Sequence, residues 1–147
     1  MSIVSSLART WLGRAASVAP LLIAVAATDW ALKAGAVASG LHTAPHSREI
    51  PWTLIALVLA VNFVWLIAYA PTPLLRLALG LWFGGALGNF GELAAHGYVT
   101  NFIPIPAGYV ASPGDVCILA GFAIFTSGRW KRAVEARRRK RRLALAS

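Results

Sequence analysis

The sequence GGALGNFGELAAHGYVTNFIPIPAGYVASPGD, residues 84–115, contains the features from which the architecture can be predicted. It starts as a glycine-rich apolar helix, passes two prolines that cannot continue a helix, and then turns into a second apolar helix. Polar side chains gather in this one stretch, at Asn89, Glu92, His96, Asn101 and Asp115. Because polar groups at membrane depth cost free energy, they usually mark a site. We therefore expect the function to lie in this stretch.

The composition indicates an integral membrane protein. The chain has 147 residues, of which 58% are hydrophobic and 13% charged. A helix needs about 20 apolar residues to cross a hydrocarbon core of about 30 Å. Four stretches approach that length: 16–41, 51–70, 73–95 and 109–127. Helices of a soluble bundle carry a polar face, which these stretches almost lack. We predict an all-α membrane protein with four transmembrane helices and a short extended extracytoplasmic segment before the last one.

The distribution of basic residues predicts the orientation. Nine of the fourteen Lys and Arg residues lie between Arg129 and Arg142, and Arg9 and Arg14 precede the first apolar stretch. The loop 96–114 contains no Lys or Arg. Since basic residues are retained on the cytoplasmic side, we expect a multi-pass protein with both termini in the cytoplasm and the polar loops outside.

The chain divides into three expected regions. Residues 1–15 form an amphipathic pattern that favours a helix lying in the membrane interface. Residues 16–128 form the four-span domain, and residues 129–147 form a basic cytoplasmic tail. Anionic lipid attracts such a tail by about 1 kcal/mol per basic residue, so we expect lipid as its partner. Nucleic acid is a much weaker alternative, and docking of a cytoplasmic partner stays open.

The sequence predicts neither a metal site nor a cofactor. The single cysteine, Cys117, excludes an intramolecular disulfide and has no partner for a metal site. No second His or Cys lies at the spacing of metal ligands around His96.

Two charged residues of the first apolar stretch are expected to pair. Asp29 and Lys33 lie four residues apart and therefore share a face of a helix. Asp29 lies too deep to be left unpaired. One interpretation is a structural ion pair with Lys33 reaching outward to the interface; the other is a pair that supports the site.

The third apolar stretch carries packing and site signals together. Its glycines have the small-residue spacing that lets helix backbones approach closely; they are Gly80, Gly84, Gly85 and Gly88. Asn89 follows, one turn before Glu92, and suits a role in holding a loop or a ligand carbonyl. Asp115 lies near the start of the fourth stretch, where backbone donors favour a carboxylate. It is either a helix cap or a site residue.

Taken in order, these motifs resemble those of the lipoprotein signal peptidases, or signal peptidase II, which are four-helix aspartic proteases of the bacterial inner membrane. Asp29 and Lys33 match the family's Asp-x-x-x-Lys element. Its Gly-Gly-x-x-Gly-Asn run is matched by residues 84–89, and its Gly-x-Val-x-Asp-Phe-Ile element appears as residues 97–103. Where the family's Asn-x-Ala-Asp element opens the fourth helix, this chain has Ser112-Pro113-Gly114-Asp115. The resemblance covers roughly residues 20–125.

The departures from the family pattern lie at its catalytic positions. The first catalytic Asp of the family aligns with Asn101, whereas the second aligns with Asp115. The family's Asn-x-x-Asp-Arg element reads Asn89-Phe-Gly-Glu92-Leu93 here, and its Asn-x-Gly-x-Ala-Phe element is missing. An aspartic dyad works because two carboxylates share one proton. An Asn amide cannot carry that proton, and losing an acid–base group costs about 10²–10⁴ in rate.

The resemblance also implies the roles of individual residues. The catalytic positions are Asp115 and Asn101, with Glu92 as the candidate substitute for the lost carboxylate. The implied substrate- or lipid-binding residues are Asn89, Asp29, Lys33, Gly85, Gly88 and Phe102.

Three functions are weighed from this pattern. The favoured hypothesis is a proteolytically degenerate relative that binds a lipid, a lipopeptide or a membrane-protein partner in the former active-site groove. The first alternative is an active, divergent aspartic peptidase that cleaves lipidated prolipoproteins. The second is an accessory or scaffold subunit of a membrane complex.

Overall fold

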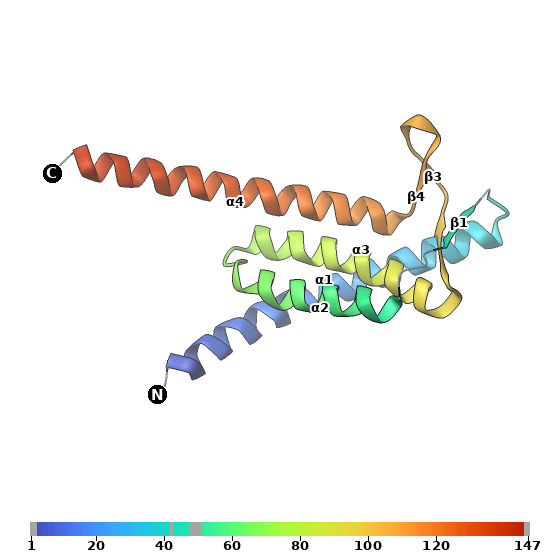
Figure 1. Ribbon diagram of the computed structural model, residues 1–147, viewed down its shortest axis with the longest axis horizontal. Helices are drawn as coiled ribbons and strands as arrows, with labels where there is room; N and C mark the ends of the chain where they lie inside the picture. Colours follow the sequence, from blue (N-terminus) through green and yellow to red (C-terminus); the bar gives the residue numbers. More distant parts are fainter. Residues whose placement is uncertain (1–2, 42, 48–50, 146–147) are drawn as a thin grey trace.

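The computed structural model describes residues 3–41, 43–47 and 51–145. Four helices make up most of the chain: α1 (Ile3–Ala38), α2 (Trp52–Ala68), α3 (Pro73–His96) and α4 (Pro113–Leu145). The remaining elements are short: β1 (Ala44–Ser47), β2 (Tyr98–Asn101), β3 (Ile103–Pro104), the 3₁₀ turn η1 (Pro106–Gly108) and β4 (Val110–Ala111). Figure 1 shows the strands at one end of the molecule, and the start of α1 and the end of α4 towards the other.

The central helix is α3, which packs against α1, α2 and α4. It begins at a proline behind the N-cap Thr72, whose Oγ1 accepts a hydrogen bond from the Leu75 N–H at 3.3 Å. It ends at Gly97, which adopts the left-handed conformation (φ 77°) that a residue with a Cβ rarely takes. Both ends of α3 are therefore encoded locally.

Glycines allow the helices to approach α3 closely. A Cβ added at Gly84 would lie 2.7 Å from the Cβ of Val25 on α1. On the other side of α3, a Cβ at Gly85 would collide with the backbone carbonyl oxygen of Gly114 at the start of α4. The prediction that the small-residue spacing serves close packing is confirmed at both contacts.

The apolar core lies between α1, α2, α3 and α4. Its fully buried side chains include Ile67 of α2 and Leu75 and Leu79 of α3. Phe63 and Phe83 meet edge to face in the same cluster, with ring centroids 5.1 Å apart. This core holds α2 against the N-terminal part of α3, while the polar residues Asn89 and Glu92 lie in the C-terminal part of α3.

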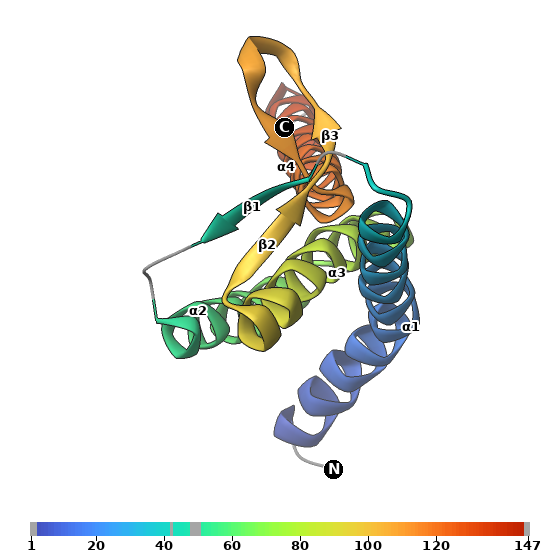
Figure 2. The same ribbon diagram turned by 90° about the vertical axis from the view of Figure 1, so that its right-hand side faces the viewer.

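The strands form two small antiparallel pairs. β1 pairs with β2 in the register Ala44↔Asn101, and β3 pairs with β4 in the register Ile103↔Ala111. Figure 2 shows β1 and β2 side by side across the end of the helices, with the β3–β4 hairpin projecting away from them. β2, β3 and β4 thus lead the chain from the end of α3 back to the start of α4.

Several expectations from the sequence can be compared with this architecture. Four helices and an extended segment before the last one are confirmed. Among the described residues, one helix is long and apolar enough to cross a membrane, over Ser6–Ala38, and a shorter apolar helix covers Thr53–Ala68. The number of spans and the orientation of the termini stay predictions.

Two expected boundaries can be compared with the structure. The N-terminal stretch predicted as a separate interfacial helix is continuous with the first apolar stretch in α1. The fourth helix starts at Pro113, close to Asp115 as expected, and the first residues of the apolar stretch 109–127 lie outside it because Val110 and Ala111 pair with β3. The outermost residues of the predicted interfacial helix and basic tail, 1–2 and 146–147, and residues 42 and 48–50 of the loop 42–50, lie outside the described residues.

Candidate functional site

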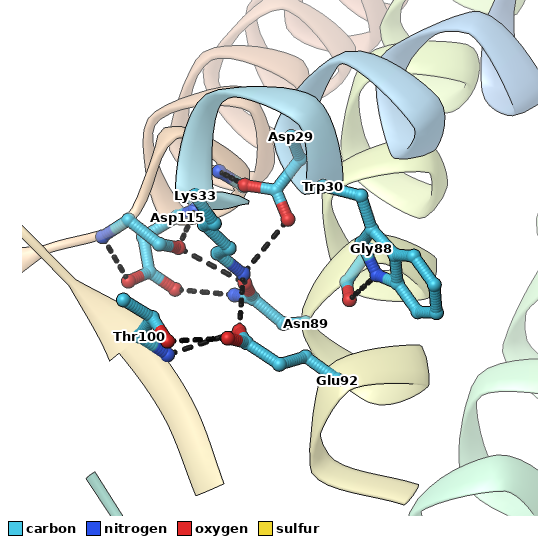
Figure 3. A network of polar contacts seen from close by, with 10 residues as sticks. Asp29, Trp30, Lys33, Gly88, Asn89, Glu92, Thr100 and Asp115 are labelled. Carbon is cyan, nitrogen blue, oxygen red and sulfur yellow. Dashed lines mark hydrogen bonds and ion pairs between the residues drawn. The ribbon is translucent and has the colours of Figure 1, made fainter. Parts of the chain in front are cut away.

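Polar side chains from α1, α3, β2 and the start of α4 meet in one connected cluster, which we call the Lys33 network (Figure 3). Its members are linked to one another by hydrogen bonds and ion pairs: Asp29, Lys33, Asn89, Glu92, Thr100, Ser112 and Asp115. Six of its seven residues lie in α1, α3, β2 and α4, and the seventh, Ser112, directly precedes α4. It lies where the sequence concentrates its polar residues.

Lys33 is the hub of this network. Its Nζ lies 2.8 Å from Asp29 Oδ2 and 3.0 Å from Glu92 Oε2. It also donates a hydrogen bond of 2.7 Å to Asn89 Oδ1. The side chains of Lys33 and Asp29 are 4% and 1% exposed. The predicted Asp29–Lys33 pair is therefore confirmed, whereas the interpretation that Lys33 reaches outward is wrong, because its ammonium lies among three oxygen acceptors inside the protein.

The close approach of α1 to α3 makes this hub possible. A Cβ at Gly88 would lie 2.5 Å from Asp29 Oδ2, so the carboxylate occupies the space that a side chain would need. One residue after Asp29, Trp30 donates from Nε1 to the carbonyl oxygen of Gly88 at 2.9 Å. The two contacts hold the polar turn of α1 against the polar turn of α3.

Asp29 also joins α1 to the start of α4. Its Oδ1 accepts a hydrogen bond of 2.6 Å from the backbone N–H of Gly114. The first N–H groups of a helix have no partner inside the helix, and a carboxylate is favoured there by the helix dipole. Asp29 therefore satisfies a backbone donor of α4 while its other oxygen pairs with Lys33.

Asp115 and Ser112 form a capping box at the start of α4. The backbone N–H of Asp115 donates to Ser112 Oγ at 3.0 Å, and the backbone N–H of Ser112 donates to Asp115 Oδ2 at 2.9 Å. Pro113 follows Ser112 as the first helical residue, where its missing N–H costs nothing. The expectation that Asp115 caps the helix is thus met by the reciprocal pattern that defines this motif.

Asn89 connects that cap to Lys33. Its Nδ2 donates to Asp115 Oδ1 at 2.8 Å, and its Oδ1 accepts from both Lys33 Nζ and Ser112 Oγ, the latter at 2.9 Å. The amide orientation is fixed by these partners, since one end faces donors and the other faces a carboxylate. Asn89 therefore stands between the ammonium and the carboxylate of Asp115.

Glu92 anchors strand β2. Its Oε2 accepts from the backbone N–H of Thr100 at 2.9 Å, and its Oε1 accepts a short hydrogen bond from Thr100 Oγ1. Its Oε2 also pairs with Lys33. In the described part of the chain no carboxylate is bonded to Asp115, whose oxygens accept from Asn89 and Ser112.

Asn101 and Phe102 follow directly on this strand. Asn101 ends β2, and its Oδ1 is buried without a hydrogen-bond partner among the described residues. The backbone N–H of Phe102 donates to the carbonyl oxygen of Ala111 at 3.1 Å, which ties the strand segment to the chain entering α4. Both residues therefore lie beside the network without joining its hydrogen bonds.

A cavity of about 390 Å³ opens next to the network. Trp30, Ala34 and Val37 of α1 form its apolar side, and Lys33 and Glu92 contribute polar atoms. A pocket of this size with mostly apolar walls and a few placed polar groups is typical of a small-ligand site. Asp115 and Asn101 do not line it.

The structure brings most of the sequence-predicted site residues together. Gly85 and Gly88 lie in the helix contacts already described, facing Gly114 and Asp29. The sequence reasoning missed Thr100 and did not assign Ser112 a role of its own. The Ser-x-x-Asp spacing before an apolar stretch is a capping-box signal that could have identified Ser112. Across the described residues, no group of three or more His, Cys, Asp or Glu side chains is placed to hold a metal ion.

Comparisons with known proteins agree on one family. A family model described as signal peptidase (SPase) II matches residues 7–129. The lipoprotein signal peptidase of Methylorubrum extorquens is 43% identical over 77 residues, covering 48% of this chain and 44% of that protein. That of Methylobacterium radiotolerans is 39% identical over 99 residues, covering 58% and 57%. The matched regions thus span about half the length of these curated relatives.

Solved structures show the same fold. Two structures of bacterial membrane enzymes, both determined by the in meso method, match with TM-scores of 0.67 and 0.61. The first match covers 80% of this chain and 90% of the other, and the second covers 77% and 92%. Sequence identity is 15% in both cases, so these matches concern the fold alone.

Proposed function

Because the chain belongs to the signal peptidase II family, we propose that it is a bacterial inner-membrane protein that binds a lipidated peptide beside the Lys33 network and lacks the two-carboxylate cleavage chemistry. The observation that carries this proposal is the amide at position 101. Asn101 stands where the resemblance places the first catalytic Asp, and the remaining Asp115 has an amide and a backbone N–H as its partners.

The chemistry of an aspartic dyad requires two carboxylates that share one proton. One activates water while the other donates to the scissile carbonyl, and both exchange protons during the reaction. Asn101 offers an N–H donor and a carbonyl acceptor but no titrating group. With Asp115 as the single carboxylate, no second group is present to donate or accept the other proton of the reaction.

Glu92 is the candidate substitute for that carrier, and its contacts argue against the role. Its carboxylate is bonded to the backbone and the hydroxyl of Thr100 and is paired with Lys33. A move towards Asp115 would break these three contacts and leave Lys33 with one carboxylate fewer. The arrangement supports Glu92 as the residue that holds β2 in place.

The adjacent cavity supports the binding part of the proposal. Apart from Lys33, its α1 wall is apolar, and its other polar groups belong to Glu92, His96, Tyr98 and Thr100. A ligand with an acyl chain and a polar linkage matches this division, because the chain is buried against α1 and the linkage meets hydrogen-bonding groups. A diacylglyceryl-modified cysteine has such a division.

An active, divergent peptidase remains the second candidate, and the names of the relatives favour it. The proteins that are 37–43% identical to the matched regions are lipoprotein signal peptidases. In that case Asp115 would be essential and a second acid would have to act beside it. The substitution Asp115→Asn therefore separates the two candidates. If the chain is an active peptidase, the substitution abolishes cleavage. If the chain binds without cleaving, there is no cleavage to lose and the substitution leaves binding of the lipidated peptide intact.

Binding can be tested with a pair of matched variants on α1. The probe is a synthetic peptide with a diacylglyceryl-cysteine and a fluorescent label, and its anisotropy is followed as purified protein in detergent is added. Ala34 lines the cavity and Ala31 is exposed on the same helix outside it. We expect saturable binding that Ala34→Trp weakens at least tenfold and Ala31→Trp leaves within twofold. Equal effects of both variants, or binding that does not saturate, would refute the proposed site.

A further inference from the structure

A second cavity, of about 480 Å³, lies at the opposite part of the helical body, between the α2–α3 hairpin and α4. Figure 1 shows α4 continuing past the turn that joins α2 to α3. We call this cavity the Arg129 groove, defined by the residues that line it on three helices: Trp65, Leu66, Trp82, Phe122, Phe125, Thr126, Arg129, Trp130 and Ala133. It shares no lining residue with the cavity beside Lys33.

The wall of the groove is aromatic. Trp82 meets Phe122 edge to face at 5.2 Å between ring centroids and lies 6.2 Å from the ring of Phe125. Trp65 and Trp130 are 58% and 71% exposed at its rim. In a membrane such a wall attracts a hydrocarbon chain through van der Waals packing, and an acyl chain fits a slot of this kind.

The groove contains the cationic side chain of Arg129, which two aromatic rings hold in place. The guanidinium carbon of Arg129 lies 5.0 Å from the ring centroid of Tyr69 and 5.8 Å from that of Phe125. A cation–π contact uses the flat face of the guanidinium and leaves the N–H donors on its edge. Within the described residues, no carboxylate pairs with Arg129 and no hydrogen bond uses its N–H groups.

The surroundings of the groove extend this positive charge. Arg132 lies three residues further along α4, on the same helical face, and is exposed. None of the residues that line the groove is acidic. An anionic group at Arg129 is therefore favoured by charge as well as by geometry.

We propose that the Arg129 groove binds one anionic phospholipid. The phosphate lies against the edge of Arg129, and one acyl chain lies along the aromatic wall formed by Trp82 and Phe122. This site is separate from the Lys33 network and does not depend on the function proposed for it.

Two other occupants fit the groove less well. Free phosphate would satisfy Arg129 but leave the aromatic wall exposed, so it would gain nothing from most of the cavity. A second copy of the chain would bring its own basic tail, and the formal net charge of +9 makes such an approach repulsive. Both occupants give distinct results in the experiment that follows.

The test uses native mass spectrometry of the full chain released from a neutral detergent. The protein is incubated with phosphatidylglycerol or with phosphatidylcholine, and the lipid-bound fraction is measured. Three variants probe the site: Arg129→Gln removes the cation, Ala133→Trp fills the groove, and Arg138→Gln removes a charge from an exposed residue of α4 that does not line it.

We expect one phosphatidylglycerol per chain, bound more tightly than phosphatidylcholine. Arg129→Gln should weaken phosphatidylglycerol about fivefold, the factor that corresponds to about 1 kcal/mol per basic residue. Ala133→Trp should abolish the one-lipid complex, and Arg138→Gln should change binding less than twofold.

Three results would overturn the proposal. Equal losses in Arg129→Gln and Arg138→Gln would mean diffuse attraction to the tail. Displacement of the lipid by an equal concentration of inorganic phosphate would mean a plain anion site. A lipid-free dimer that Ala133→Trp disrupts would mean that the groove is an interface between copies of the chain.

Discussion

Removing the charge of Lys33 should destabilise the protein more than removing any exposed basic residue. In Lys33→Met the ammonium is lost, while Asp29 and Glu92 keep their positions with side chains 1% and 9% exposed. Removing one partner of a buried ion pair costs about 3–5 kcal/mol, because the other charge stays buried without compensation. Two carboxylates share Lys33, so the upper part of that range applies.

This free energy can be converted into a shift of the unfolding midpoint. For domains of about 150–250 residues, 1 kcal/mol changes the Tm by about 2–4 °C. Lys33→Met should therefore lower the apparent Tm in detergent by about 8–20 °C, measured by tryptophan fluorescence on heating. The control Lys131→Met changes an exposed residue, for which an effect within about 0.5 kcal/mol is expected.

A second variant tests the electrostatic origin of the shift. Adding Glu92→Gln to Lys33→Met removes one of the two uncompensated carboxylates and keeps the size of the side chain. The double variant should therefore recover part of the lost Tm. A Tm shift for Lys33→Met no larger than that for Lys131→Met, or an additively lower Tm in the double variant, would exclude a buried ion pair as the cause.

Three further substitutions test the packing, the cap and the strand anchor, each by the apparent Tm in detergent. Gly84→Ala places a Cβ against α1 and should cost about 1–3 kcal/mol. The control Gly13→Ala, with nothing within 4 Å of the added Cβ, should cost nothing. A loss for Gly84→Ala no larger than that for Gly13→Ala would contradict the close packing of α1 and α3. Ser112→Ala should cost about 0.5–2 kcal/mol through the lost cap, and a loss no larger than that of Ser127→Ala would exclude the capping role. Thr100→Val removes the hydroxyl bonded to Glu92 and should cost about 1–3 kcal/mol; an unchanged Tm would mean that this anchor is dispensable.

The helices could be predicted because their causes are local. Long apolar stretches, the proline before α3 and the glycine after it are all visible in the sequence. The turn at residues 112–115 likewise predicts where α4 begins, but the pairing of the apolar residues Val110 and Ala111 with β3 could not be predicted. That pairing depends on a partner strand and leaves no pattern in the residues themselves.

Strand β1 could not be predicted for a similar reason. Its residues read Ala-Pro-His-Ser, which contains a proline and no β-branched or aromatic strand former. It is a strand because it lies against β2 in the register Ala44↔Asn101. The residues of β1 have little strand propensity of their own, so the strand forms only because the tertiary fold brings it against β2.

The site was predicted in its parts but not in its connections. The four-residue spacing predicts that Asp29 and Lys33 meet, but the contact of Lys33 with Glu92 depends on how α1 is rotated against α3. Glu92 was considered as a substitute acid, whereas its contact with Thr100 requires β2 to return along α3. Contacts between elements of this kind are decided by tertiary packing.

The most direct test of the account is the cleavage of a lipidated prolipoprotein by the purified chain in detergent. The unmodified chain is compared with Asn101→Asp, which restores the second carboxylate, and with Asp115→Asn, which removes the remaining one. We predict no cleavage above the Asp115→Asn background by the unmodified chain and a gain of at least about 10² in rate for Asn101→Asp. Cleavage by the unmodified chain that disappears in Asp115→Asn would contradict it and would identify an active peptidase with a different second acid.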